Sequence, residues 1–324
     1  MAPDAEATPK TPETGAPKFE RMALIGVGLI GSSIARAARR ADLVGSIVGC
    51  ARTAKTRDKA MELGIVDAMY EDPAEAVAGA DLVIVCSHLG SYATVGAAMA
   101  SSLAPGAIVT DVGSVKGCVA RDLGPHIPAG VHLIPGHPVS GSEKTGPEAG
   151  YAELFDNRWW ILTPAEDADQ DMVQRLKNFV LGLGSRVEIM AADRHDLVLA
   201  ITSHLPHLIA YNIVSTADDM ETVTQGEVVK FSAGGFRDFT RIAASDPEFW
   251  RDVFLNNRDA VLETLGRFTE DLLALQRSIR WGEGDKLLEV FSQSRDIRQR
   301  IVEAGQDTGA ADFGRRTEPP TNSD

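Results

Sequence analysis

A glycine-rich turn between an apolar strand and a helix constrains this chain more than any other feature. Residues 26–31 read Gly-Val-Gly-Leu-Ile-Gly, directly after the apolar run Met22–Ile25 and directly before the helix-forming run Ser32–Arg40. In this arrangement the glycines permit a tight turn, a close approach of backbone to a pyrophosphate, and packing of the helix on the strand. The helix N-terminus then offers free N–H groups to the phosphates. The alternative is a strand–helix turn with no ligand. The candidate cofactor-binding residues of the turn are Gly26, Gly28, Leu29, Ile30 and Gly31.

Short β-branched runs alternate with Ala-rich helical runs up to about residue 190. The predicted strands are Met22–Ile25, Ser46–Cys50, Leu82–Cys86, Ile108–Val112, His132–Ile134, Trp160–Thr163 and Val187–Met190. The intervening helices include Gly31–Arg40, Arg57–Leu63 and Asp171–Leu181. Such alternation predicts βαβ units, so the fold class is α/β, with a Rossmann-type doubly wound sheet in the N-terminal part.

After residue 190 strand patterns stop and helical patterns take over, at Asp193–Ser215, Pro247–Arg280 and Asp285–Ala304. The first of these is apolar on more than one side, so it must be buried in its own domain or against another subunit. We therefore predict an all-α C-terminal domain and a homodimer formed through it. The predicted divisions are a disordered tail 1–18, a dinucleotide-binding domain 19–190, a helical dimerisation and substrate domain 191–304, and a second tail 305–324.

Composition narrows the class of partner. A formal charge of -14 argues against nucleic acid or an anionic membrane surface. The three cysteines are far apart and suggest no disulfide framework and no metal site. We expect no bilayer span and no signal peptide, hence a cytoplasmic protein that binds a small molecule.

The end of the second strand leaves the cofactor open between NAD and NADP. An NAD enzyme usually has an acid there to bind the ribose, but this chain has Cys-Ala-Arg-Thr at 50–53. Arg52 and Thr53 could accept a 2′-phosphate, Arg52 could stack on adenine, or it could be a solvated loop cation. Ser87, just after the strand 82–86, completes the candidate cofactor-binding residues.

Two loops follow later strands, at 111–116 and 135–143, and both should face the nicotinamide because ligands bind outside the carboxyl ends of such sheets. His137 is flanked by loop-forming Gly and Pro, and an imidazole can take a proton from an alcohol as hydride leaves the same carbon. Ser114 can orient the imidazole or the substrate hydroxyl. We expect both to be catalytic. Lys116 fits either a substrate contact or a solvated lysine.

Five motifs together resemble the prephenate/arogenate dehydrogenase family of tyrosine biosynthesis. They are G-V-G-L-I-G-S at 26–32, D-V-G-S-V-K at 111–116, G-H-P-V-S-G-S-E at 136–143, S-H-L-P-H at 203–207 and G-G-F-R-D-F-T-R-I-A at 234–243. The resemblance covers roughly residues 20–303. It implies oxidative decarboxylation of prephenate to 4-hydroxyphenylpyruvate, or of arogenate to tyrosine. It also implies a homodimer, slightly favours NAD, and suggests tyrosine as a feedback inhibitor.

The same resemblance assigns roles to individual residues. His137 is then the base for the ring hydroxyl, with Ser114 as its partner. The implied substrate-binding residues are Ser142, Glu143, His207 and Arg241. Arg241 would clamp a carboxylate with its planar fork, or pair with Asp238 as an ordinary ion pair. Trp250 would support the pocket wall, or simply fill the core. No metal is needed.

Two other functions stay open at this point. A β-hydroxyacid dehydrogenase would share the Rossmann half, but it uses a lysine in a glycine-rich segment that this chain lacks after residue 150. A non-catalytic protein that senses NAD(P) is the other alternative, and the His137 and Ser114 loops argue against it.

Overall fold

The computed structural model describes residues 18–141, 144–224 and 233–303. By its internal contacts the chain divides into two compact units, 1–264 and 265–324. The predicted tails fall almost entirely outside the described residues. The predicted boundary near residue 190 stays a prediction.

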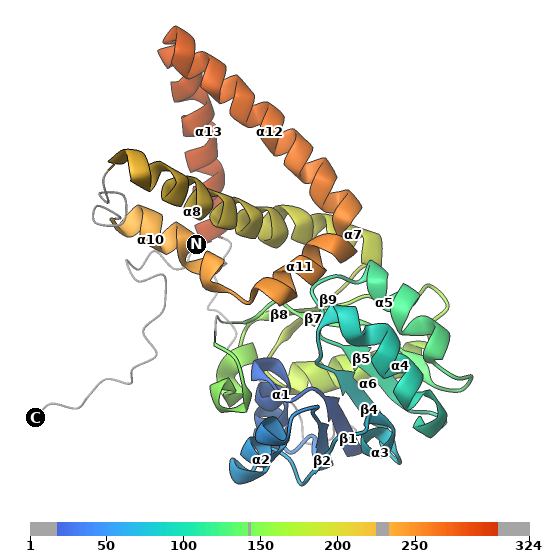
Figure 1. Cartoon of the computed structure of the whole chain (residues 1–324). Helices are drawn as coiled ribbons and strands as arrows, with labels where there is room; N and C mark the ends of the chain where they lie inside the picture. The colour runs from blue at the N-terminus through green and yellow to red at the C-terminus, as the bar shows by residue number, and fades with distance from the viewer. Residues whose placement is uncertain (1–17, 142–143, 225–232, 304–324) are drawn as a thin grey trace, which may run out of the picture. The chain divides into compact units, whose positions relative to one another are not determined.

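Six parallel strands form the main sheet of the first unit, in the order β3-β2-β1-β4-β5-β6 (Figure 1). They are β1 (Phe19–Ile25), β2 (Val44–Cys50), β3 (Ala68–Tyr70), β4 (Leu82–Val85), β5 (Ile108–Asp111) and β6 (His132–Leu133). The strand order reverses between β1 and β4, which is where a doubly wound sheet opens a crevice for a ligand. This arrangement confirms the predicted fold class, although the short strand β3 was not predicted.

Both faces of this sheet are buried. Along β1, Met22 and Leu24 belong to one hydrophobic core, and Ala23 and Ile25 belong to the other. The near-continuous apolar runs of the sequence reflect this two-sided burial. The first core is covered by α1 (Leu29–Arg40) and α6 (Gln170–Gly182). The second is covered by α3 (Pro73–Val77), α4 (Tyr92–Met99) and α5 (Gly117–Asp122), and by α11 (Pro247–Asn256) from the C-terminal half.

Three helices begin at aspartates that accept hydrogen bonds from the first-turn N–H groups. Asp72 caps α3, Asp169 caps α6 and Asp246 caps α11. The first and last caps are each followed by proline, which suits the first helical position because its missing N–H has no partner there. Helix α2 (Ala54–Glu62) is capped in the same way by Thr53.

A second, smaller sheet contains three strands in the order β7-β8-β9. They are β7 (Gly136–Pro138), β8 (Trp159–Leu162) and β9 (Arg186–Ile189). Strand β7 runs antiparallel to β8 and places His137 opposite Ile161. The prediction of a loop over 135–143 was therefore wrong for residues 136–138, and the last two predicted strands do not join the main sheet. Gly136 and Pro138 suggested a loop, but β7 is an edge strand, where proline is tolerated.

Residues 192–224 form a helix in three parts. They are α7 (Ala192–Leu199), the π-helical turn η6 (Ala200–His204) and α8 (Leu205–Thr224). The sequence predicted one helix without this turn. Pro206 gives the physical reason, because a proline inside a helix has no N–H and its ring crowds the carbonyl four residues earlier.

Further along the described residues come the helices α10 (Gly234–Thr240), α11 and α12 (Arg258–Trp281), with the short η7 (Arg241–Ala244) after α10. The single helix predicted from 247 to 280 is broken at Asn257, whose side chain makes tertiary hydrogen bonds.

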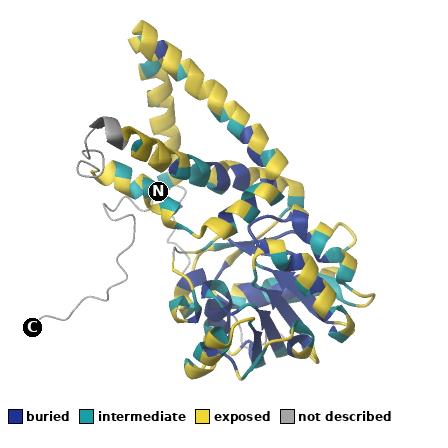
Figure 2. Ribbon diagram, in the orientation of Figure 1, coloured by how far each residue is buried: buried dark blue, intermediate teal, exposed yellow. Residues whose placement is uncertain are grey.

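In the second unit the end of α12 turns at Gly282, which has a positive φ of 68°, into α13 (Gly284–Glu303). Both helices are largely exposed (Figure 2). Large apolar side chains are among their exposed residues. Leu273, Ile279, Trp281, Leu288 and Phe291 are each more than half exposed. An apolar surface of this kind is usually covered by another chain.

The segment Ala192–Met220 is long and apolar enough to cross a bilayer, with a mean hydropathy of 1.5 over its most apolar window, of which 28% is buried. The expectation that no such stretch exists was therefore wrong. Length and composition alone are weak evidence that a helix crosses a membrane. This helix also buries His195 and Asp196 near its start and His204 in its middle, which does not favour a span. Histidine and aspartate are costly inside a bilayer.

Candidate active site

A buried ion pair at the carboxyl end of β5 organises the candidate site. Lys116 Nζ lies 2.5 Å from Asp111 Oδ2 and 2.6 Å from the Gly136 carbonyl oxygen, and both side chains of the pair are fully buried. Asp111 also accepts hydrogen bonds from the Tyr92 hydroxyl (2.9 Å) and the Gly136 N–H (3.2 Å). The pair thus joins the main sheet to the residue just before His137. Lys116 is therefore a buried ion-pair partner of Asp111 and not a solvated lysine.

His137 lies at one end of a chain of hydrogen bonds. Its Nδ1 is 2.8 Å from His195 Nε2, and His195 Nδ1 is 2.8 Å from Asp196 Oδ1. Asp196 accepts in addition from the backbone N–H groups of Lys116 (2.7 Å) and Gly117 (2.8 Å). Strand β7, the start of α7 and the N-terminus of α5 are therefore held together by one carboxylate and two imidazoles.

The environment keeps both imidazoles neutral near pH 7. Burial lowers the pKa of His137 well below its usual value, and the nearby His195, Lys116 and His204 lower it further. Burial likewise lowers the pKa of His195, which Asp196 only partly opposes. A neutral imidazole has one N–H and one free electron pair, so His137 can act as a proton acceptor.

Seven buried side-chain nitrogen and oxygen atoms have no well-formed hydrogen bond among the described residues. Ser114 Oγ and His204 Nε2 are two of them. Asn257 Nδ2 donates to His204 Nδ1 at 3.0 Å, so the proton of neutral His204 sits on Nε2. Burial lowers the pKa of His204 to about 4, opposed in part by Asp196 and a backbone contact with Ser114. A buried polar atom without a partner needs an explanation, and for Ser114 Oγ a ligand is one source of the missing partner.

His207 lies one helical turn beyond the π turn and stacks on Trp250. The two rings are 3.6 Å apart between centroids and inclined by 22°. His207 Nδ1 bonds the Ser203 carbonyl at 2.9 Å. Burial lowers the pKa of His207, and the charge of Arg241, at the start of η7, lowers it further. Trp250 is buried, so it both fills the core and supports this histidine. Asp238, which the sequence offered as an ion-pair partner for Arg241, forms an ion pair with Arg237, with 3.6 Å between Asp238 Oδ1 and Arg237 Nε.

The glycine turn has the geometry that a dinucleotide requires. Gly26 has a positive φ of 106°, and a Cβ at Gly31 would overlap the Gly26 carbonyl oxygen. Gly28 is the N-cap of α1 and supplies no side-chain cap, so the first N–H groups of the helix remain available. A Cβ built on Gly28 meets no atom within 4 Å, which leaves open space above these donors. Leu29 and Ile30 form the first turn of α1, so the turn fits a pyrophosphate.

The residues at the end of β2 favour neither cofactor. Arg52 is exposed, and Thr53 is engaged as the cap of α2. Glu71, the acid on the neighbouring segment, forms an ion pair with Arg57 at 2.9 Å. Ser87 follows β4 at the same edge of the sheet, half-buried, and accepts a hydrogen bond from Ser91.

The predicted substrate-binding residues Ser142 and Glu143 lie outside the described residues. Several residues that the structure places near His137 were also not identified from the sequence. His195, Asp196, His204 and Asn257 were not singled out, and only charged and polar residues in a largely apolar helix could have suggested the first three.

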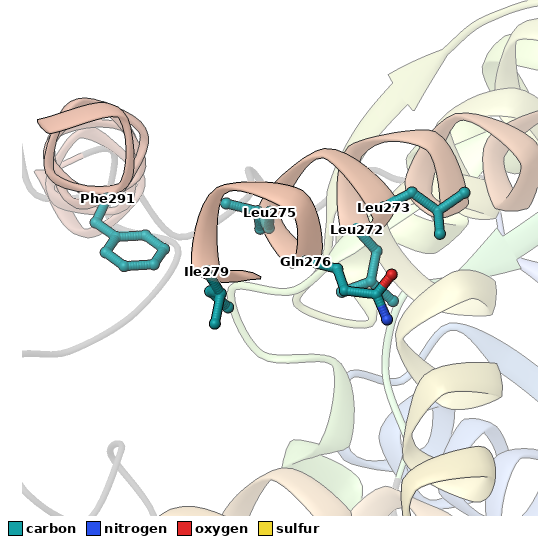
Figure 3. Close-up of a pocket in the computed structure, with 6 residues that line it drawn as sticks. All are labelled: Leu272, Leu273, Leu275, Gln276, Ile279 and Phe291. Carbon is teal, nitrogen blue, oxygen red and sulfur yellow. The ribbon is translucent and has the colours of Figure 1, made fainter. Parts of the chain in front are cut away.

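A pocket on the second unit is lined by no acidic, basic or histidine side chain. Its lining comes from α12 and α13 and is apolar apart from one amide (Figure 3). The lining residues are Leu272, Leu273, Leu275, Gln276, Ile279 and Phe291. Because it offers no titratable side chain, it suits contact with another protein surface better than catalysis.

Two family models match the chain. Residues 34–189 match the prephenate dehydrogenase nucleotide-binding domain, and residues 191–293 match the prephenate dehydrogenase dimerization domain. Similar curated proteins include a cyclohexadienyl dehydrogenase from Zymomonas mobilis, 39% identical over 86% of this chain and 95% of that protein. A prephenate dehydrogenase from Bacillus subtilis is 31% identical over 86% of this chain and 75% of its own length.

Solved structures of prephenate and arogenate dehydrogenases are also similar to this chain. The prephenate dehydrogenase from Aquifex aeolicus, solved with hydroxyphenyl propionate and NAD+, superposes with a TM-score of 0.83 at 32% identity, covering 89% of this chain and 100% of that one. The arogenate dehydrogenase from Synechocystis gives a TM-score of 0.73 at 26% identity, covering 87% and 99%.

Removing the lysine of the buried pair should destabilise the protein strongly. We expect Lys116→Met to lower the free energy of unfolding by about 3–5 kcal/mol, because Asp111 is left buried without its counter-charge. The double change Lys116→Met with Asp111→Asn should recover part of this loss. Urea unfolding followed by circular dichroism measures both. A loss below about 1 kcal/mol in the single variant would contradict the argument.

Acid should destabilise the fold through its buried histidines. The pKa of His204 is about 4 in the folded protein, against ~6.5 in an unfolded chain. Between these values only the unfolded chain takes up the proton, so stability is complete above pH ~6.5 and falls as the pH drops toward 4. For His204 alone the fall is on the order of 3 kcal/mol. Calorimetry across this range should show it, and His204→Gln should reduce the slope by about one proton. An identical slope in that variant would refute the assignment.

Proposed function

The chain belongs to the prephenate dehydrogenase family, and on that premise we propose that it oxidatively decarboxylates prephenate to 4-hydroxyphenylpyruvate, arogenate to tyrosine, or both. It is an oxidoreductase of tyrosine biosynthesis with a Rossmann-type NAD(P)-binding fold. The family assignment favours this activity over a β-hydroxyacid dehydrogenase.

One observation carries the proposal. His137, buried and neutral, is held at the carboxyl edge of the main sheet, the same edge at which the glycine turn follows β1. Gly136, beside it, is bonded to Asp111 at the end of β5. A proton acceptor at the edge where a dinucleotide binds is what an alcohol dehydrogenation needs.

His137 is the base for the ring hydroxyl of the substrate. Its Nδ1 is occupied by His195, so Nε2 is the atom that faces the reaction. Ser114 Oγ and His204 Nε2, both buried and without a well-formed hydrogen bond, are donors or acceptors suited to holding the same hydroxyl and orienting His137.

When bound, NAD(P) would supply the acceptor for the hydride of the carbon that bears the hydroxyl. His137 takes the hydroxyl proton as the carbon–oxygen double bond forms. The bond between the ring and its carboxylate then breaks, its electron pair enters the ring, and carbon dioxide leaves. The ring becomes aromatic, and His137 returns the proton to the oxygen to give the phenol. Aromatisation supplies the driving force, so the protein mainly positions groups.

Binding of the substrate side chain falls to the helical part of unit 1. Arg241 clamps a carboxylate, and His207, fixed by Trp250 and Ser203, contacts the side chain beside it. Ser142 and Glu143, which lie outside the described residues, line or gate the same site by resemblance to the family.

The wider proposals rest on the family as well. Residues 19–190 form the dinucleotide-binding domain and 191–304 the helical domain. A homodimer forms through the latter, supported by the exposed apolar side chains of α12 and α13. We place the enzyme in the cytoplasm and propose that tyrosine inhibits it, which steady-state inhibition assays can test.

Replacing the base should abolish most of the activity. We expect His137→Asn to lower kcat by roughly 10²–10⁴ from loss of general-base catalysis, with dinucleotide binding retained. NADH formation with prephenate and with arogenate, in separate assays, measures this. His132→Asn, the same change in edge strand β6, is the control. Unchanged turnover in His137→Asn would favour a protein that only senses NAD(P).

The residues at the end of β2 do not decide the cofactor, but the resemblance to the family slightly favours NAD, and we expect Arg52 to support the remaining use of NADP. Arg52→Ala should lower kcat/KM for NADP about tenfold, the loss of one charge-assisted phosphate contact, and leave NAD within about twofold. Lys55→Ala, an exposed cation on α2, is the matched control. A higher kcat/KM for NADP than for NAD in the unaltered enzyme would overturn the preference.

A further inference from the structure

The hydrogen-bond chain behind His137 determines which of its nitrogens holds the proton. We propose that His195 and Asp196 are positioning residues, which lock neutral His137 with its proton on Nδ1 and its electron pair on Nε2. This inference rests on the proposed function only in giving Nε2 a substrate to act on.

Asp196 determines which atom donates in each hydrogen bond from Asp196 through His195 to His137. The Asp196 carboxylate can only accept, and it already accepts from the backbone N–H groups of Lys116 and Gly117. The 2.8 Å contact with His195 Nδ1 therefore requires the proton to be on that nitrogen. Neutral His195 then has its electron pair on Nε2.

The same reasoning carries the order to His137. Because His195 Nε2 has no proton, the 2.8 Å contact is made by a proton on His137 Nδ1. Nε2 of His137 is then the unprotonated atom, which is the form a general base must have. The opposite form would present an N–H to the substrate hydroxyl and could not accept its proton.

The chain also supports the charge that develops on His137. When Nε2 takes the hydroxyl proton, the Nδ1–H donor becomes charged and its bond to His195 strengthens. His195 in turn donates to the Asp196 carboxylate. The other charged or titratable groups around these two rings are Lys116, His204 and Asp111.

Asp196 accepts two backbone hydrogen bonds that do not involve His195. His195 can therefore be replaced while Asp196 keeps its position. In His195→Leu the carboxylate keeps its two backbone donors, and His137 Nδ1 loses its acceptor. In His195→Gln the side-chain amide oxygen can replace Nε2 as that acceptor. The two variants differ mainly in the hydrogen bond at issue.

Steady-state kinetics with the full-length enzyme separates positioning from a structural role. We expect His195→Leu to lower kcat by roughly 10–10³ with KM and dinucleotide affinity within about threefold, and His195→Gln to recover most of it. His132→Leu and His132→Gln are the controls. Equal losses in both His195 variants, with weakened binding, would mean a structural role and overturn the proposal.

Nitrogen-15 spectra of the ring nitrogens test the inference even if neither prephenate nor arogenate is a substrate. With the His137→Asn variant for assignment, the unaltered protein at pH 7.5 should show His137 protonated on Nδ1, and His195→Leu should show a mixture or the reverse. A proton on Nε2 of His137 in the unaltered protein would refute the proposal. Inactivity toward both substrates with the expected spectrum would refute only the proposed function.

Discussion

The buried ion pair between Lys116 and Asp111 is the interaction on which the site depends. Two charges removed from water are stable only when every remaining donor and acceptor is satisfied. Here the carboxylate binds the ammonium, a tyrosine hydroxyl and backbone N–H groups, and the ammonium also binds the Gly136 carbonyl. This requirement fixes the end of β5 against the start of β7. His137, the next residue, inherits a backbone position that a flexible loop would not provide.

A second carboxylate completes the framework from the other side. Asp196 joins the N-terminus of α5 to α7 and orders the imidazoles. The π turn after α7 brings His204 toward Ser114, and Asn257, at the break between α11 and α12, holds His204 in place. The irregular points of the helical segments thus lie close to His137 and Ser114, the candidate catalytic residues. Departures from regular helix at such places are common in functional sites.

The two units differ in which side chains they bury and which they expose. Within the described residues, unit 1 buries Asp111, Lys116, His195 and Asp196 in hydrogen-bond networks that adjoin His137. The helices of unit 2 expose leucine, isoleucine and phenylalanine side chains that a monomer would not keep in water without cost. The match of residues 191–293 to a dimerization domain is consistent with such a surface.

Local patterns in the sequence determined the parallel sheet, the glycine turn and most helices, since these depend on apolar periodicity and on backbone freedom at Gly26, Gly28 and Gly31. The motif at 136–143 also identified His137 as a candidate base. Only the tertiary structure decided that Lys116 is a buried partner of Asp111, that β7 leaves the main sheet, and that His195 and Asp196 stand behind His137. These contacts join residues 5 to 80 positions apart, and no local periodicity specifies which polar side chains will share a buried site. That choice follows from the demand that each buried charge find its partners once the elements are packed.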